Sequence, residues 1–171
     1  MRSSTKWFAT AAIVASAGVA GGAQLATAQD DPTPPPPQPT PVCELVTKEE
    51  ATAALGDAVV MKDAGRSCAF TVARSPDGFR SLSVGLGPDG VTAALFAEGM
   101  RGYAEVANVT LRAVHDTGDE AWVTLDDQVS QLVARRGERF VSIIFVNVKT
   151  PFDERIATMA ALARKSLSRI G

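Results

Sequence analysis

VSQLVARRGERFVSIIFVNV, residues 129–148, contains the clearest pattern in this chain. Val129–Arg135 alternates and predicts a strand, Arg136-Gly137 is typical of a tight turn, and Phe140–Val148 predicts a second strand. Apolar side chains occupy both faces of that second strand: Val141, Ile143 and Phe145 on one face, and Ile144, Val146 and Val148 on the other. A strand that is apolar on both faces is expected to be central and covered on both sides.

The alternation continues upstream of this segment. Two shorter apolar runs, separated by the turn residues 115–119, predict two more strands, so residues 106–148 form a meander of four strands. Residues 67–74 and 80–86 also alternate, and the Ser-Pro-Asp-Gly sequence at 75–78 between them predicts a turn. These two runs therefore predict a β-hairpin.

Two helices are predicted before the meander. The first begins with a capping box, in which Thr47 caps the helix and Glu50 reaches back to the start, and Gly56 suits its left-handed end. The second covers about residues 91–101, where apolar residues recur at helical spacing, and Gly102 is expected to stop it.

A third helix is predicted at the C-terminal end, where Thr150 caps and Pro151 takes the first helical position. Its apolar stripe is expected to pack across the sheet. The predicted order is therefore α-β-β-α-β-β-β-β-α. Strands grouped in runs and joined by tight turns favour antiparallel pairing. The expected fold class is α+β, with an antiparallel sheet of about six strands packed by helices.

The N-terminal segment has the pattern of a secretory signal peptide. Arg2 and Lys6 precede an apolar run from Trp7 to Ala23, and Ala26-Thr27-Ala28 is a small-x-small cleavage site. Residues 1–28 are therefore interpreted as a signal peptide that exports the chain. Retention of this segment as an N-terminal membrane anchor is the alternative.

The rest of the chain is expected to be one exported domain behind a spacer. Residues 29–41 are rich in proline and predict a disordered spacer, and residues 42–171 predict a single domain. Arg2 and Lys6 are the only charged residues of the signal segment, so their removal changes the formal net charge from −2 to −4. This mild acidity argues against nucleic acid as a partner. No transmembrane segment is expected in the mature chain.

The chain contains two cysteines, Cys43 and Cys68. In an oxidising compartment an even pair is expected to form a disulfide. No C-x-x-C spacing indicates a redox-active pair.

Several short motifs together resemble a known group of proteins. They are the C-x-L-V-T start within Pro41–Glu50, Ala54-Leu55-Gly56, Ser67–Phe70, the G-D-E-A turn within Thr117–Trp122, and Val133–Glu138. The chain resembles small exported proteins and lipoproteins of high-GC Gram-positive bacteria, whose domain has no established activity. The resemblance implies a fold type and a location in the cell envelope. The lipid-attachment cysteine that many of those proteins carry is absent from this chain.

Catalytic motifs are scarce. His115 is the only histidine, and no G-x-S-x-G or G-x-x-x-x-G-K-S/T motif is present. A G-x-G-x-x-G sequence at residues 85–90 is interpreted as a strand end followed by a Pro-Asp-Gly turn. The chain is therefore expected not to be an enzyme. The alternative is a hydrolase-like envelope enzyme that uses the carboxylates of Asp119 and Glu120.

Other polar residues near the turns are candidates for binding. His115, Asp116, Asp119 and Glu120 predict either a cation site or a hairpin turn in which Asp and Gly adopt turn conformations. A metal-binding module is thus a further alternative, although no cofactor is expected.

Trp122, Arg135 and Arg136 are candidate ligand-binding residues, because an indole ring can line a pocket and guanidinium groups bind anions. The preferred hypothesis is a secreted, non-catalytic domain of the cell envelope. It would bind a protein or a small ligand on its sheet, or in a groove between the sheet and its helices.

Overall fold

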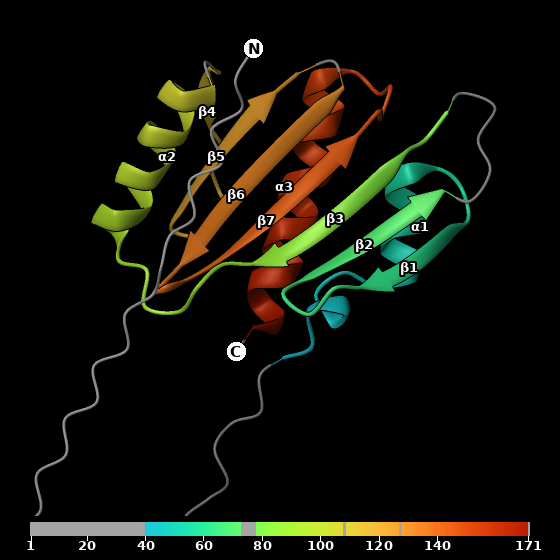
Figure 1. Cartoon of the computed structure of the whole chain (residues 1–171), viewed down its shortest axis with the longest axis horizontal. Helices are drawn as coiled ribbons and strands as arrows, with labels where there is room; N and C mark the ends of the chain where they lie inside the picture. Colours follow the sequence, from blue (N-terminus) through green and yellow to red (C-terminus); the bar gives the residue numbers. More distant parts are fainter. Residues whose placement is uncertain (1–39, 73–77, 108, 127, 171) are drawn as a thin grey trace, which may run out of the picture. The chain divides into compact units, whose positions relative to one another are not determined.

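The computed structural model describes residues 40–72, 78–107, 109–126 and 128–170 (Figure 1). The signal segment, residues 1–28, and the spacer up to residue 39 lie outside the described residues. None of the helices in the described part of the chain has both the length and the apolar character that a membrane span requires.

The described strands form one antiparallel sheet of seven strands in the order β1-β2-β3-β7-β6-β5-β4 (Figure 1). Their bounds are β1 Val59–Asp63, β2 Ser67–Val72, β3 Ser81–Leu86, β4 Leu111–Ala113, β5 Glu120–Leu125, β6 Val129–Arg136 and β7 Arg139–Val146. The β2–β3 hairpin and the β4–β7 meander match the expected pairings. The α+β class with an antiparallel sheet is confirmed.

The sheet has one strand more than the six that the sequence predicts. The extra strand is β1, which pairs with β2 at the edge of the sheet. Of its residues only Val59 is buried, whereas Val60 and Met61 are 58% and 48% exposed. Strand β1 lies at the edge of the sheet and buries little, so its apolar and polar residues do not alternate. The sequence therefore contains no pattern that predicts this strand.

Three α-helices lie among the described residues: α1 Lys48–Leu55, α2 Ala93–Ala107 and α3 Phe152–Arg169. The capping box of α1 is present, since the Thr47 hydroxyl accepts from the Glu50 N–H and the Glu50 carboxylate accepts from the Thr47 N–H. Gly56 ends α1 in the left-handed conformation, with φ of 72°.

The predicted ends of the other two helices need correction. Helix α2 continues through Gly102 to Ala107, because a glycine inside a helix costs only about 1 kcal/mol and does not by itself end it. Pro151, rather than Thr150, occupies the N-cap position of α3, and no side-chain bond caps that end. The Thr150 carbonyl instead accepts from Arg155.

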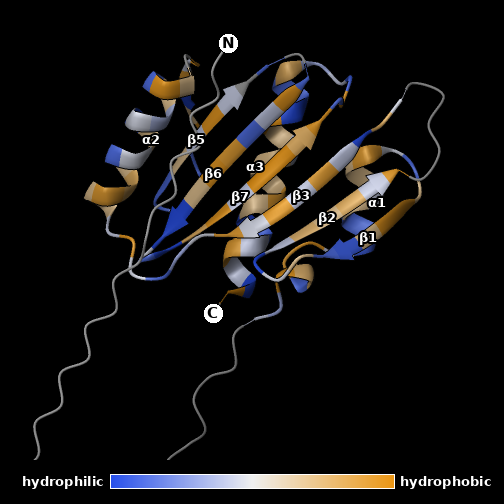
Figure 2. Ribbon diagram, viewed as in Figure 1, coloured by the Kyte–Doolittle hydropathy of each residue, from blue (hydrophilic) through white to orange (hydrophobic). Residues whose placement is uncertain are grey.

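The core lies between α3 and one face of the sheet. Strand β7 is the middle strand, as expected, and its residues Val141, Ile143 and Phe145 are at most 1% exposed. Met159 and Ala163 of α3 belong to the same buried cluster. Figure 2 shows hydrophobic residues along β3, β6, β7 and α3.

The opposite face of the sheet, here called the outer face, is covered differently. Alternate residues of a strand point to opposite faces, so Phe140 and Ser142 of β7 lie on the outer face. Helix α2 crosses this face, where the rings of Phe96 and Phe140 are 5.8 Å apart. The predicted place of Val148 on this face is wrong, because Asn147 after β7 has φ of 53° and Val148 joins the core instead.

The predicted disulfide between Cys43 and Cys68 is present. Cys43 lies in the short 3-10 helix η1, Val42–Glu44, and Cys68 is a fully buried residue of β2. The bond ties the segment that leads into α1 to the sheet.

Candidate functional site: a groove under α2

Three of the predicted site residues meet on the outer face of β5 and β6. The indole N–H of Trp122 donates to the Glu120 carboxylate at 2.9 Å. Glu120 pairs in register with Arg135, and its Oε2 lies 3.9 Å from the Arg135 Nε. The carboxylate of Glu120 is therefore held between two side chains of the sheet.

Asp119 is held by the same arginine and by a turn. Its Oδ2 accepts from the Gly137 N–H at 2.7 Å and lies 3.6 Å from Arg135 Nη1. Its own N–H donates to the Arg135 carbonyl at 2.8 Å. These contacts fasten the β4–β5 loop to the β6–β7 turn, so both carboxylates stabilise the sheet. Arg136 lies apart from them, exposed at the end of β6.

The four predicted metal ligands are not assembled into a site. His115 and Asp116 are exposed residues of the turn before β5, and Arg164 of α3 donates to the Asp116 carbonyl at 3.4 Å. In the part of the chain that the structure describes, no group of three or more His, Cys, Asp or Glu side chains could hold a metal ion.

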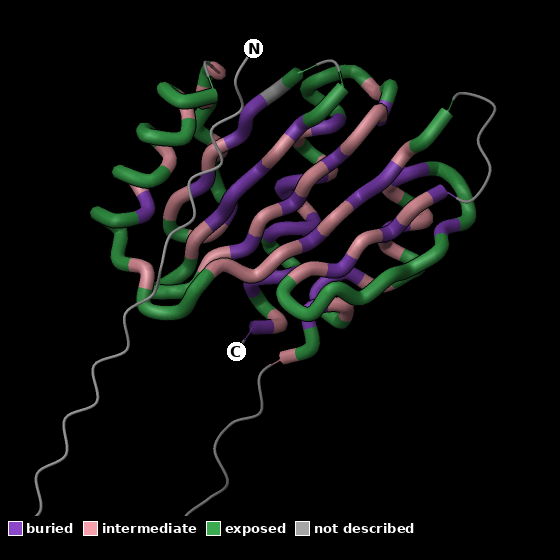
Figure 3. Tube along the Cα trace, in the orientation of Figure 1, coloured by how far each residue is buried: buried purple, intermediate pink, exposed green. Residues whose placement is uncertain are grey.

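A groove of about 430 Å³ lies between α2 and the outer face of the sheet. Helix α2 forms one wall with the apolar residues Leu95, Phe96 and Met100, together with Gly99 and Tyr103. Phe96 is the one buried residue of this helix, all of whose residues are described. Figure 3 shows how much of α2 is exposed. The helix thus buries only one of its residues, and a groove remains between it and the sheet.

The floor of the groove is formed by β6 and β7. Val133 of β6 and Phe140 of β7 are its apolar residues, and Gln131 and Ser142 are its polar ones. A Cβ on Gly87 would lie 1.9 Å from the Phe140 ring, so only a glycine leaves room for this ring at its position. The floor is therefore a preformed part of the sheet.

Trp122 is adjacent to the groove, although it does not line it. It pairs in register with Val133, and both residues point to the outer face. The cluster of Trp122, Glu120 and Arg135 thus borders the groove on the β5 side. Of the predicted ligand-binding residues, Trp122 and Arg135 lie beside the groove.

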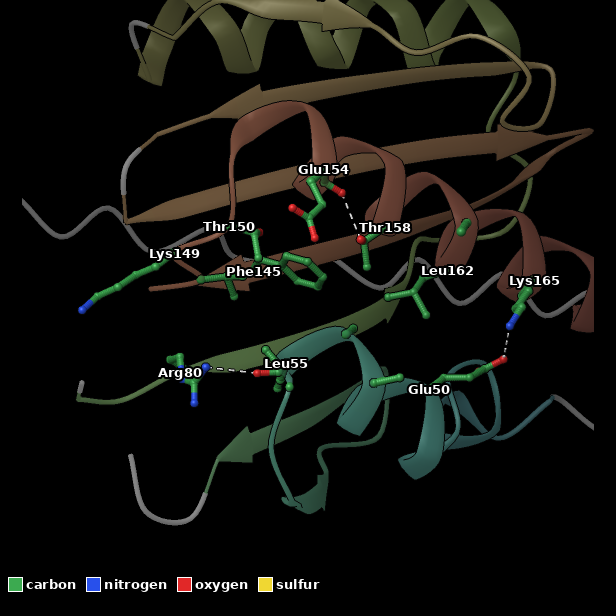
Figure 4. A pocket seen from close by; sticks show the side chains of 15 residues that line it. Glu50, Leu55, Arg80, Phe145, Lys149, Thr150, Glu154, Thr158, Leu162 and Lys165 are labelled. Atoms are coloured by element: carbon green, nitrogen blue, oxygen red, sulfur yellow. Dashed lines mark hydrogen bonds and ion pairs between the residues drawn. The ribbon is translucent and has the colours of Figure 1, made fainter. Parts of the chain in front are cut away.

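A second pocket of about 640 Å³ lies between α1 and α3 (Figure 4). Its floor includes Leu55, Phe145 and Leu162, and the Glu154 carboxylate points toward the side chain of Phe145. Arg80 lies at one end, where it donates to the Leu55 carbonyl at 3.1 Å and to Asp57 at 2.7 Å. This guanidinium satisfies the C-terminal end of α1.

Charged groups at the other end of this pocket neutralise one another. The Arg169 guanidinium donates to both carboxylate oxygens of Glu50, at 2.7 and 2.8 Å. The Lys165 ammonium lies 3.0 Å from the same carboxylate, as Figure 4 shows. The bond from Arg169 is the main reason that the pKa of Glu50 falls from 4.5 to about 2. The ion pairs join α1 to α3. Because Arg80 at one end of this pocket and Glu50 and Lys165 at the other are already paired, the groove under α2 is the better candidate for a ligand.

Glu50→Gln is expected to lower the free energy of unfolding at pH 7 by about 2 kcal/mol. This value is smaller than the full pKa shift implies, because solvent partly screens the ion pairs of Glu50. A lowered carboxyl pKa stabilises the fold above the unfolded value of 4.5, and this stabilisation is lost as the pH falls toward 2. Urea unfolding between pH 2 and pH 7 should therefore show a shallower pH dependence in the variant.

Glu49→Gln is the matched control, since Glu49 occupies the same first turn of α1. Its unfolding free energy should stay within about 0.5 kcal/mol of the wild-type value. Equal losses in the two variants would contradict the role assigned to the Glu50 ion pairs.

Sequence reasoning missed most residues of the groove. The apolar residues of α2 have the spacing of a helix that packs on a core. A helix that forms one wall of an open groove has the same spacing, so the sequence does not distinguish the two. Gln131 and Tyr103 carry no motif. The presence of two glycines, Gly99 and Gly102, inside an apolar helix is the one signal in the sequence that α2 packs loosely.

No protein-family model, curated protein or solved structure matches this chain.

Proposed function

We propose that this protein is an exported, non-catalytic domain of the cell envelope that binds an apolar ligand in the groove under α2. The observation that carries the proposal is the way α2 lies on the sheet. A helix with an apolar stripe normally buries that stripe. Here Leu95 remains 58% exposed and Tyr103 42% exposed, beside a groove of about 430 Å³.

The dimensions and lining of the groove support binding of a small molecule. Ligand pockets commonly measure about 300–1,000 Å³ and have mainly apolar linings with a few polar groups. The groove has this composition, with Gln131, Ser142 and Tyr103 as its polar side chains. Burial of the exposed apolar residues of α2 by a ligand would stabilise the complex.

Export is proposed from the sequence. The signal pattern of residues 1–28 and the resemblance to exported proteins of high-GC Gram-positive bacteria support it. The disulfide is of the kind that persists in oxidising compartments.

Gly99→Leu is expected to block the groove, because Gly99 lines it and a Cβ there would meet nothing within 4 Å. The added side chain should enter the open space without displacing the sheet. Binding of the apolar dye 1-anilinonaphthalene-8-sulfonate should weaken about tenfold or more, which corresponds to the loss of about 1.4 kcal/mol of apolar contact. Titration followed by dye fluorescence measures the affinity.

Gly102→Leu provides the control for this experiment. Gly102 lies in the same helix and also has nothing within 4 Å, but it does not line the groove. Both variants gain the same helix propensity, about 0.8 kcal/mol. The control should bind the dye as the wild type does, and equal dye binding by all three proteins would disprove the proposed site.

A further inference from the structure

We propose that the ligand of the groove under α2 is a single extended aliphatic chain with a carbonyl-bearing polar end, an inference that rests on the proposed function. The source of such a chain is either a free fatty acid or the acyl chain of a membrane lipid. Three features of the groove support this class of ligand: its length along α2, the lack of backbone partners and the position of its polar groups.

The first feature is the length of the groove. It follows α2 from Leu95 to Tyr103, which is about 12 Å at a rise of 1.5 Å per residue. Its volume of about 430 Å³ lies within the range of about 300–1,000 Å³ that is common for small-ligand pockets. One extended aliphatic chain can therefore lie along the groove beside α2.

An extended peptide fits the groove poorly for a chemical reason. Its backbone N–H and C=O groups would leave water, and each group without a partner would oppose binding. The floor is the face of β6 and β7, whose own backbone groups pair within the sheet, and the sheet edges β1 and β4 lie elsewhere. An aliphatic chain has no such groups to satisfy, and no charged side chain lines the groove.

Two of the three polar side chains of the groove lie toward one end, and the third, Ser142, pairs in register with Val133 nearer the middle. Phe140 contacts Phe96 in the N-terminal part of α2. On β6, Gln131 is two residues farther from Phe140 than Val133 is. Tyr103 lies in the C-terminal half of α2. Among the described residues, neither the Gln131 amide nor the Tyr103 hydroxyl has a hydrogen-bond partner. Both groups can donate to a carbonyl oxygen, so this end suits the polar end of the chain.

Saturated fatty acids of about eight to sixteen carbons test the proposal directly. In the processed protein Trp122 is the single tryptophan, because Trp7 lies in the signal segment, and Trp122 neighbours Val133 of the floor. Its fluorescence should change as the groove fills. The affinity should rise about fourfold with each added methylene until the groove is full. A chain-length dependence that is flat would overturn the inference.

Variants and a second lipid source complete the experiment. Gly99→Leu should weaken fatty-acid binding at least tenfold, whereas Gly102→Leu should not. Gln131→Leu should weaken binding of the acid about threefold to tenfold and leave binding of the matching alkane unchanged. Co-sedimentation with phosphatidylglycerol vesicles then distinguishes the sources: retention on vesicles that Gly99→Leu abolishes identifies a membrane lipid, and its absence identifies a free acid.

The outcomes separate this inference from the proposed function. If Gly99→Leu blocks the dye but no fatty acid or lipid binds, the groove is a binding site and the aliphatic ligand is wrong. If neither the dye nor any fatty acid responds to Gly99→Leu, both proposals are wrong.

Discussion

Replacement of both Cys43 and Cys68 by alanine is expected to lower the free energy of unfolding by about 3.5 kcal/mol. The bond joins residues 25 positions apart and limits the conformations of the unfolded chain. Its loss also frees η1 and the entry to α1 from β2. Small domains are stable by only about 5–15 kcal/mol, so the effect is a large fraction of the total. Urea unfolding of the oxidised protein and the double variant measures the difference.

Chemical reduction of the wild type supplies the control. The reduced protein and the double variant should unfold at similar urea concentrations, because both lack the disulfide. They differ only in that the variant also lacks the two sulfur atoms. Cys68 is fully buried, so its truncation adds a small packing loss to the variant alone. An unfolding free energy of the variant within about 1 kcal/mol of the oxidised wild type would contradict the predicted role of the bond.

Gly118→Ala is expected to destabilise the protein by about 3 kcal/mol. Gly118 has φ of 78°, a conformation that costs an alanine about 1–2 kcal/mol. Its Cβ would also lie 2.4 Å from the Arg135 carbonyl oxygen, which accepts from the Asp119 N–H. Relief of this clash would break that hydrogen bond and add about 1–3 kcal/mol. Thermal and urea unfolding followed by circular dichroism measure the loss.

Gly137→Ala separates the two causes. Gly137 also has a positive φ, 60°, but a Cβ there would meet no atom within 4 Å. Its variant should therefore lose only the conformational part, about 1–2 kcal/mol. If Gly118→Ala were no more destabilising than Gly137→Ala, the contact between the β4–β5 loop and β6 would not have the importance inferred here.

The carboxylates beside Trp122 show why a polar cluster in a sequence need not be a site. Asp119 and Glu120 both contact Arg135, and together they hold a loop and a turn against the sheet. The sequence places two carboxylates side by side but does not show that a single arginine on β6 lies against both. That arginine becomes their neighbour only through the register of β5 and β6.

The elements that the sequence alone determined are those with strong local signals. Spacing and turn chemistry, which act over a few residues, predict the capping box of α1, the β2–β3 hairpin and the meander ending in β7. The partner of Cys43 follows from composition, because the chain has only two cysteines. Strand β1 lacked such a signal, because it lies at an edge and buries only Val59.

Only the tertiary structure decided the groove. The spacing of apolar residues in α2 specifies an amphipathic helix, but not how closely that helix approaches its sheet. The approach depends on Phe96 meeting Phe140, and on Gly87 leaving room for the Phe140 ring. These residues come from α2, β7 and the loop after β3. These segments are far apart in the chain, and the periodicity of a sequence describes one helix or strand at a time. It therefore does not show which side chains of different elements meet, because that depends on how whole elements pack in three dimensions.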